Sequence, residues 1–301
     1  MRKMDRFSVT FRGVRGGHPV PGPETVRYGG NTTCIEVRAG KHIIIIDAGS
    51  GIIPLGDLLL NETEEDEKLT ILLLLTHTHN DHIEGFPFFR PAYQPTTTLN
   101  IFGPKLFPND LEDILKRSMM SPRFPISLDE LPCEWRIGFI RNQEMLILTE
   151  PDDMPQAYHT VRDALELPPD TVKITSLRSS SHPNGVMFFR IEYRGKSMVC
   201  ATDTESYIGG DQRLVNFARS TDLLIHDAEY TDEEYLAFQS WGHSTWRMAC
   251  DIAAQAGITR MALTHHHDRH DDDFVDRMED AAKAMMPGAF FAREGMTVEL
   301  L

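Results

Sequence analysis

The stretch THTHNDHIEG, residues 76–85, contains three histidines and an aspartate within six positions, directly after the apolar run ILLLL. His77 and His79 alternate along an extended chain and so point the same way, while Asp81 and His82 lie one turn further on. Imidazole and carboxylate are ligands of zinc, manganese and ferrous iron. A solvated loop in a histidine-rich chain is the alternative, but so many polar groups beside an apolar strand would be costly without a cation. The spacing therefore predicts a metal centre.

Metal-type residues recur where other predicted strands end. They are His182 after VKITSLRSSS, Asp203 after the hairpin VMFFRIEYRGKSMVCATD, His226 and Asp227 in DLLIHDAEY, and His265 after ITRMALT. Open α/β sheets place their sites outside the carboxyl ends of strands. These residues are therefore expected to gather around the opening motif.

The elements that must position these residues alternate between strands and helices. The strand IIIIDAG leads into a short helix at about 54–60, and a second helix is expected near 110–120. The helix in WGHSTWRMACDIAAQAG has Ser244 or Thr245 as its N-cap and Gly257 as its C-cap. Two halves of strands followed by helices predict a layered α/β sandwich in one domain over 1–301, with an excursion or cap at about 104–170.

Composition limits the compartment and the partners. With 41% hydrophobic and 25% charged residues, the 301-residue chain is typical of a globular enzyme. Its apolar runs fall far short of the ~20 residues that cross a bilayer, and MRKMDRFSVTF has no apolar signal core. Four widely separated cysteines suit a reducing compartment. We expect a cytoplasmic protein with no membrane partner, and the net charge of −15 disfavours extended nucleic acid.

In order and in strand-end context, the separated elements resemble the ligand set of the metallo-β-lactamase superfamily over nearly the whole chain. That resemblance implies a four-layer αβ/βα sandwich with two divalent metal ions, zinc first and manganese or iron as alternatives. It assigns one ion to His77, His79 and His182, the other to Asp81, His82 and His265, and the bridge to Asp203. A hydroxide between the ions would be the nucleophile, with Asp81 among the catalytic residues.

Other segments resemble the phosphodiesterase branch that includes tRNase Z and the cyclic phosphodiesterases. YGGNTTCIEV, IIIIDAGSG and HNDHIEGFPFF resemble its signatures, as do HDAE at 226–229 and GHST at 242–245. The resemblance makes His243 a catalytic residue beside the scissile phosphate, oriented by a carboxylate. Asp227 stands where Glu is usual and Glu229 where Thr is usual, so the orienting carboxylate is left open between them, with Asp227 taken as the catalytic choice.

The resemblance gives Asp47 a supporting role, and the roles of several other residues are weighed from the sequence itself. Asp47 is expected to support the metal loop through hydrogen bonds rather than to bind metal. The glycine-rich loop around residues 16–30 either forms turns or brings backbone amides near a phosphate, and whether His18 faces the pocket is open. His159 is expected at a surface or interface. The histidines of HHHDRH beyond His265 are expected to be supporting or solvated.

The substrate follows from these assignments. A small phosphodiester is expected, with a cyclic nucleotide or related cyclic phosphate leading. One rival is a tRNA 3′-end endonuclease, which needs an RNA-gripping surface, and no glycine-rich basic arm lies between the motifs. A lactone or thioester hydrolase has less need of His243, and a non-catalytic member would have lost ligands. Related phosphodiesterases are often dimers, which leaves a homodimer as an open expectation.

Overall fold

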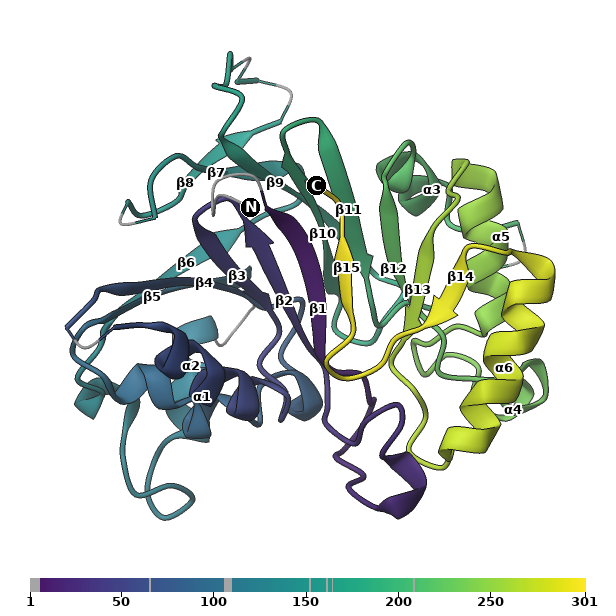
Figure 1. Ribbon diagram of the computed structural model, residues 1–301, viewed down its shortest axis with the longest axis horizontal. Coiled ribbons are helices and arrows are strands. Elements are labelled where there is room, and N and C mark those ends of the chain that lie inside the picture. Colours follow the sequence, from purple (N-terminus) through teal and green to yellow (C-terminus); the bar gives the residue numbers. More distant parts are fainter. Residues whose placement is uncertain are drawn as a thin grey trace.

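The computed structural model shows two β-sheets packed face to face, with helices over both outer faces (Figure 1). The fold is therefore the four-layer αβ/βα sandwich that the resemblance implies. The structure describes residues 6–64, 66–105, 110–151, 153–160, 162–163, 165–207 and 209–301. Within these ranges, no helix is long and apolar enough to cross a membrane.

The first sheet has the strand order β15-β1-β2-β3-β4-β5-β6. Its strands are β1 (Phe7–Gly13), β2 (Cys34–Ala39), β3 (His42–Ile46), β4 (Leu69–Leu74), β5 (Thr97–Pro104), β6 (Glu134–Ile140) and β15 (Thr297–Glu299). β4 is apolar on both faces because Leu72 and Leu74 enter the core between the sheets, whereas Ile71 and Leu73 pack beneath the helices. From β3 to β6 the strands run parallel.

The second sheet has the order β14-β13-β12-β11-β10-β9-β7-β8. Its strands are β7 (Glu144–Leu148), β8 (Gln156–His159), β9 (Val172–Ser179), β10 (Val186–Tyr193), β11 (Lys196–Ala201), β12 (Leu223–Asp227), β13 (Met261–Thr264) and β14 (Ala289–Phe291). Strands β11 to β14 are parallel, and β10 is antiparallel to both β9 and β11. The carboxyl ends of β9, β11, β12 and β13 therefore meet at one edge.

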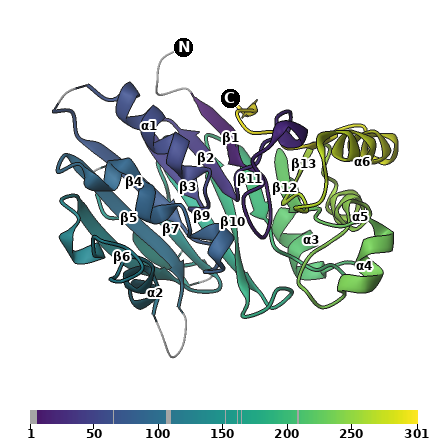
Figure 2. The same cartoon turned by 90° about the horizontal axis from the view of Figure 1, so that it is seen from below.

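Helices cover the sheets on opposite sides of the molecule (Figure 2). They are α1 (Ile52–Glu62) and α2 (Leu111–Ser118) on the first sheet, and α3 (Gln212–Ala218), α4 (Asp232–Phe238), α5 (Trp246–Ala256) and α6 (Asp272–Met285) beside the second. The side chain of Thr245 caps α5 by accepting from the amide of Met248, and Gly257 ends the helix at φ 70°. Of the two N-caps predicted for α5, the structure thus selects Thr245.

The predicted excursion at about 104–170 contributes to both sheets. β6 pairs with β5 at the edge of the first sheet, and β7 pairs with β9 in the second. The intervening α2 buries Leu111 and Leu115 against the first sheet. This segment thus extends the sheets while its helix covers one outer face, and the assignment of a single domain to 1–301 stays a prediction.

Candidate active site

The seven predicted metal ligands lie together at one edge of the two sheets. The four residues of the opening motif follow β4, and the other three follow β9, β11 and β13; the set is His77, His79, Asp81, His82, His182, Asp203 and His265. Their ligand-type atoms fall into two groups, within each of which they lie no more than 4.8 Å apart. At this edge the amide of Met187 donates to the carbonyl of Thr76 at 2.9 Å, which joins the two sheets. The role of the seven as ligands stays a prediction.

The first group consists of three imidazoles. Nδ1 of His79 lies 2.9 Å from Nε2 of His182. The ring centroids of His77 and His79 are 4.5 Å apart, and those of His77 and His182 are 4.8 Å apart. Three nitrogens thus converge on a volume that suits one cation.

The second group combines two imidazoles with two carboxylates. Nε2 of His265 lies 3.3 Å from Oδ2 of Asp81 and 3.3 Å from Oδ2 of Asp203. Nε2 of His82 is 3.2 Å from the same oxygen of Asp203. That oxygen is also 3.7 Å from Nε2 of His77, a member of the first group. Asp203 therefore stands between the groups, where a bridging ligand is expected.

The donor set fits divalent cations. The buried Nε2 atoms of His77 and His82 have no hydrogen-bond partner among the described residues, which is costly unless an ion satisfies them. Burial lowers the pKa of His77 far below its ordinary value. Burial raises the pKa of Asp203, but imidazoles led by that of His265 outweigh it and hold the pKa well below the ordinary value. Burial lowers the pKa of His82 and His265, but carboxylates led by that of Asp203 outweigh it and raise the pKa of both well above the ordinary value. Neutral imidazole and ionised carboxylate are the forms that bind metal, so a cation would displace protons from these two rings.

Asp47 orients the ligand loop from behind. Its Oδ1 accepts from the amide of Thr76 at 2.8 Å, and its Oδ2 accepts from the Thr76 hydroxyl at 2.8 Å. The same Oδ2 lies 2.8 Å from Nδ1 of His82 and, by accepting from this nitrogen, fixes the tautomer that leaves Nε2 free for metal. The structure thus places Asp47 in the supporting position expected from the sequence.

Asp47→Asn should weaken metal affinity by about 10–100-fold, because the amide has one acceptor oxygen where the carboxylate has two. Its NH2 group, in place of the other oxygen, cannot accept either from the Thr76 amide or from the Thr76 hydroxyl and the His82 ring. Asparagine keeps the shape and tolerates the φ of 63° at this position. Competition with a chelator of known affinity would measure the change. An unchanged affinity would show that the carboxylate does not orient the ligand.

Two further imidazoles are held by the segments that the sequence analysis associated with catalysis. Nδ1 of His182 donates to the carbonyl of Gly242 at 3.0 Å. Nδ1 of His265 lies 3.1 Å from Oε2 of Glu229. The segments at 226–229 and 242–245 therefore orient predicted metal ligands as well as His243.

His243 lies beside the two groups and is oriented by two carboxylates. Its Nδ1 is 2.8 Å from Oδ2 of Asp227 and 3.1 Å from Oε2 of Glu229. Asp227 is itself fixed, because its Oδ1 accepts from the amides of Ser244 and Glu229 at 2.9 and 3.2 Å. The ring of His243 stacks on that of His265, with centroids 4.7 Å apart. Asp227 is the closer partner of His243, while Glu229 is shared with His265.

Comparison with known proteins identifies the family of this chain. A family model described as a beta-lactamase superfamily domain matches residues 42–266. The chain belongs to the metallo-β-lactamase superfamily. Ribonuclease Z of Exiguobacterium sibiricum is 27% identical over 247 residues, which cover 75% of this chain and 80% of that protein.

Solved structures of the superfamily share the fold. The metallo-beta-lactamase fold protein YhfI from Bacillus subtilis has a TM-score of 0.67 and 20% identity, covering 98% of this chain and 100% of that chain. The short form of human tRNase Z has a TM-score of 0.64 and 19% identity, covering 98% of this chain and 99% of that one.

In this superfamily member the glycine-rich loop packs directly on the centre. The amide of Gly17 donates to Oδ2 of Asp81 at 2.9 Å. A Cβ on Gly16 would lie 2.2 Å from the His265 ring, so only glycine fits there. The loop therefore has a positional role beyond turn formation. His18 faces the cavity rim, is 60% exposed, and pairs with Asp268 at 3.0 Å.

A cavity of about 340 Å³ opens over the site. It is bordered by His79, Asp81, Asp203, His243 and His265. Five further lining residues were missed in the sequence, namely Tyr230, Phe238, Trp241, Asp268 and Arg269. Aromatic residues are ordinary core material, so nothing in their spacing marks them, although Trp241 immediately precedes the GHST segment.

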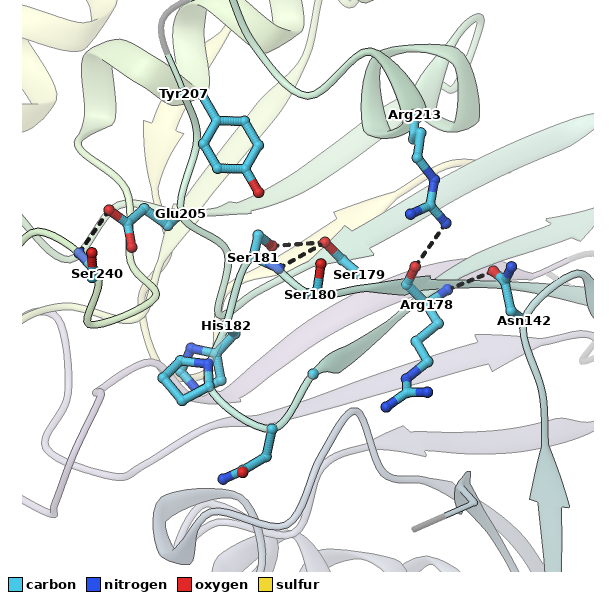
Figure 3. Close-up of a pocket in the computed structure, with 13 residues that line it drawn as sticks. Asn142, Arg178, Ser179, Ser180, Ser181, His182, Glu205, Tyr207, Arg213 and Ser240 are labelled. Carbon is cyan, nitrogen blue, oxygen red and sulfur yellow. Dashed lines mark hydrogen bonds between the residues drawn. The ribbon is translucent and has the colours of Figure 1, made fainter. Parts of the chain in front are cut away.

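A second, wider cavity of about 950 Å³ begins at His182 (Figure 3). Arg178 and Arg213 border it, and a guanidinium nitrogen of Arg213 donates to the carbonyl of Arg178 at 2.9 Å. Glu205 and Ser240 also line it, with the Ser240 amide donating to Glu205 at 2.9 Å. The loop at 240–243 thus contributes to both cavities.

The remaining histidines lie outside the two groups. The expectation that His226 would join these groups is wrong, because this buried ring donates through Nδ1 to the carbonyl of Asp227 at 2.7 Å and does not reach the cluster. Nε2 of His266 donates to the carbonyl of Ala292, and Nε2 of His270 pairs with Glu234. His267 borders the smaller cavity. His159 ends β8, away from the site.

Proposed function

We propose that this protein is a dinuclear metal-dependent phosphodiesterase that hydrolyses a small phosphodiester, with a cyclic nucleotide or related cyclic phosphate as the leading class. The observation that carries the proposal is the position of His243, which Asp227 holds against the seven-residue cluster and at the wall of the cavity. A histidine in this position suits phosphoryl transfer because a leaving oxygen needs a proton.

The cluster residues and His243 would have different roles in the reaction. The seven cluster residues would hold two divalent ions, zinc first and manganese or iron as alternatives, which when bound would activate water and neutralise phosphate charge. Oδ2 of Asp227 accepts a hydrogen bond from Nδ1 of His243, which leaves Nε2 of this ring for the substrate at the cavity wall. From there the imidazolium can stabilise charge on the phosphate or donate its proton to the departing alkoxide.

The size and charge of the site support a small substrate. A cavity of about 340 Å³ is at the lower end of the usual range for small-molecule sites. The net charge of −15 opposes a long polyanion, although metal ions would dominate the field within the cavity. A tRNA 3′-end endonuclease is the second candidate, and the relatives named ribonuclease Z favour it. Hydrolysis of a lactone or thioester has less need of a residue with the role proposed for His243.

A substrate panel tests the proposal. Protein loaded with zinc or with manganese is expected to hydrolyse bis(p-nitrophenyl) phosphate and at least one cyclic nucleotide, and to leave a tRNA precursor and a lactone intact. Cleavage of the precursor at its 3′ end would favour the endonuclease. Hydrolysis of the lactone without any phosphodiester cleavage would overturn the assignment.

A further inference from the structure

Aromatic side chains form one part of the lining of the cavity over the site. The rings of Tyr230 and Phe238 are stacked with centroids 5.1 Å apart and planes at 15°. Phe238 in turn meets Trp241 edge to face at 5.3 Å. Along this row exposure rises from the buried Tyr230, through the half-buried Phe238, to Trp241, which is 61% exposed. A large apolar surface is therefore open to solvent at the mouth of a cavity whose other lining is polar.

The loop that carries Trp241 is fixed relative to the predicted metal ligands. Glu205 accepts from the amides of Ser240 and Gly242 at 2.9 and 3.1 Å, on either side of the tryptophan. The carbonyl of Gly242 holds His182. A Cβ on Gly242, whose φ is 97°, would lie 2.3 Å from Nδ1 of His182, so this contact depends on glycine. The indole is thus held by the same loop that orients a predicted metal ligand, which reduces the entropic cost of binding a ligand against it.

A cation borders the same cavity. Arg269 is exposed, lines the cavity, and forms no salt bridge with another described residue. The neighbouring Asp268 lines the same cavity but pairs with His18 at 3.0 Å and with His267 at 2.7 Å. The guanidinium of Arg269 is therefore left for an anionic ligand, in a chain whose net charge is −15. The cavity therefore combines aromatic, cationic and metal-type surfaces.

We propose that Trp241, backed by Phe238, is a nucleobase-binding surface, so that the substrate is a nucleotide whose base stacks on the indole while its phosphate lies at the metal centre. This inference rests on the proposed function and narrows it to nucleotide phosphodiesters. Stacking of a base on an aromatic side chain is tolerant of base identity, because every base has a π face. Purine and pyrimidine nucleotides should therefore both bind.

Binding of products tests the inference without turnover. In metal-loaded protein, Trp241→Ala should weaken the affinity for adenosine 5′-monophosphate by about 5- to 150-fold, the effect expected from loss of one stacked base. Titration calorimetry would measure this affinity. Ribose 5-phosphate, which lacks the base, should bind the wild type and this variant equally. Trp241→Phe retains an aromatic face and should keep most of the affinity, while abolishing the tryptophan quenching that the nucleotide produces in the wild type.

Leu236→Ala is the matched control, because Leu236 is 74% exposed but does not line the cavity. It should bind both ligands like the wild type. Equal binding of the two ligands by wild-type protein would overturn the base-binding surface while leaving phosphodiester hydrolysis intact. So would a Trp241→Ala variant that changes oligomeric state without changing nucleotide affinity. Absence of any phosphodiester cleavage would instead contradict the proposed function. The titrations would still show whether Trp241 binds the base of a nucleotide.

Discussion

Asp203→Ala should leave the protein with almost no bound metal, whereas wild-type protein purified without chelator should hold about two divalent ions per chain. The physical reason is that one oxygen of Asp203 lies between the two ligand groups, 3.2 Å from His82 and 3.7 Å from His77. Without this charge the two cations would repel each other across neutral imidazoles. Phosphodiester turnover should fall by at least about 10³-fold, since metal ions supply several kcal/mol of transition-state stabilisation.

Elemental analysis of both proteins measures this effect, and two variants control it. Asp203→Asn keeps the side-chain shape and suits the φ of 57°, so metal loss in this variant would follow from charge and not from strain. His159→Ala removes an imidazole outside both groups and should keep full metal content and activity. Thermal unfolding with and without chelator would establish that each variant is folded, because bound metal raises the midpoint. Equal metal content in the Asp203 and His159 variants would refute the ligand assignment.

The convergence of the ligands could be predicted because it depends on local signals. Apolar runs such as ILLLL mark buried strands, and parallel strands deliver their carboxyl ends to one edge. His77, His182, Asp203 and His265 each follow such an end, and the resemblance to the superfamily supplied their grouping across the two sheets. The strand-end position alone was not sufficient, because His226 also lies at the end of a strand and is outside both groups. The caps of α5 could be predicted in the same way, since Thr245 and Gly257 form hydrogen bonds with backbone groups only three or four residues away.

Contacts that depend on distant segments could not be predicted in this way. Whether Glu229 or Asp227 orients His243 depends on how the turn after β12 meets the loop before α5, and the structure shows that Glu229 also reaches His265. The cavity position of Trp241 depends on the anchoring of its loop by Glu205, 36 residues earlier. Side-chain type and spacing contain no information on such pairings.

His243→Ala should keep both metal ions but lower hydrolysis of a cyclic nucleotide by about 10²–10⁴-fold, the usual contribution of a positioned acid or base. The ring is placed for this task because Asp227 holds its Nδ1 at 2.8 Å while the side chain borders the cavity. Asp227→Asn keeps the shape but removes the ionised acceptor, so turnover should fall by an intermediate factor. Steady-state kinetics with parallel metal analysis would separate these losses from loss of metal.

The leaving group decides whether the imidazole acts as an acid. The alkoxide expelled from a cyclic nucleotide leaves poorly without a proton, whereas nitrophenolate from bis(p-nitrophenyl) phosphate leaves unaided. If the ring donates a proton, its removal should therefore lower the activity of the enzyme toward the cyclic nucleotide much more than toward the nitrophenyl ester. Similarly large losses on both substrates would indicate that His243 stabilises phosphate charge instead. Equally small losses on both would reduce His243 to a residue that packs against His265 and precedes the cap of α5, and the phosphodiesterase assignment would lose the observation on which it rests.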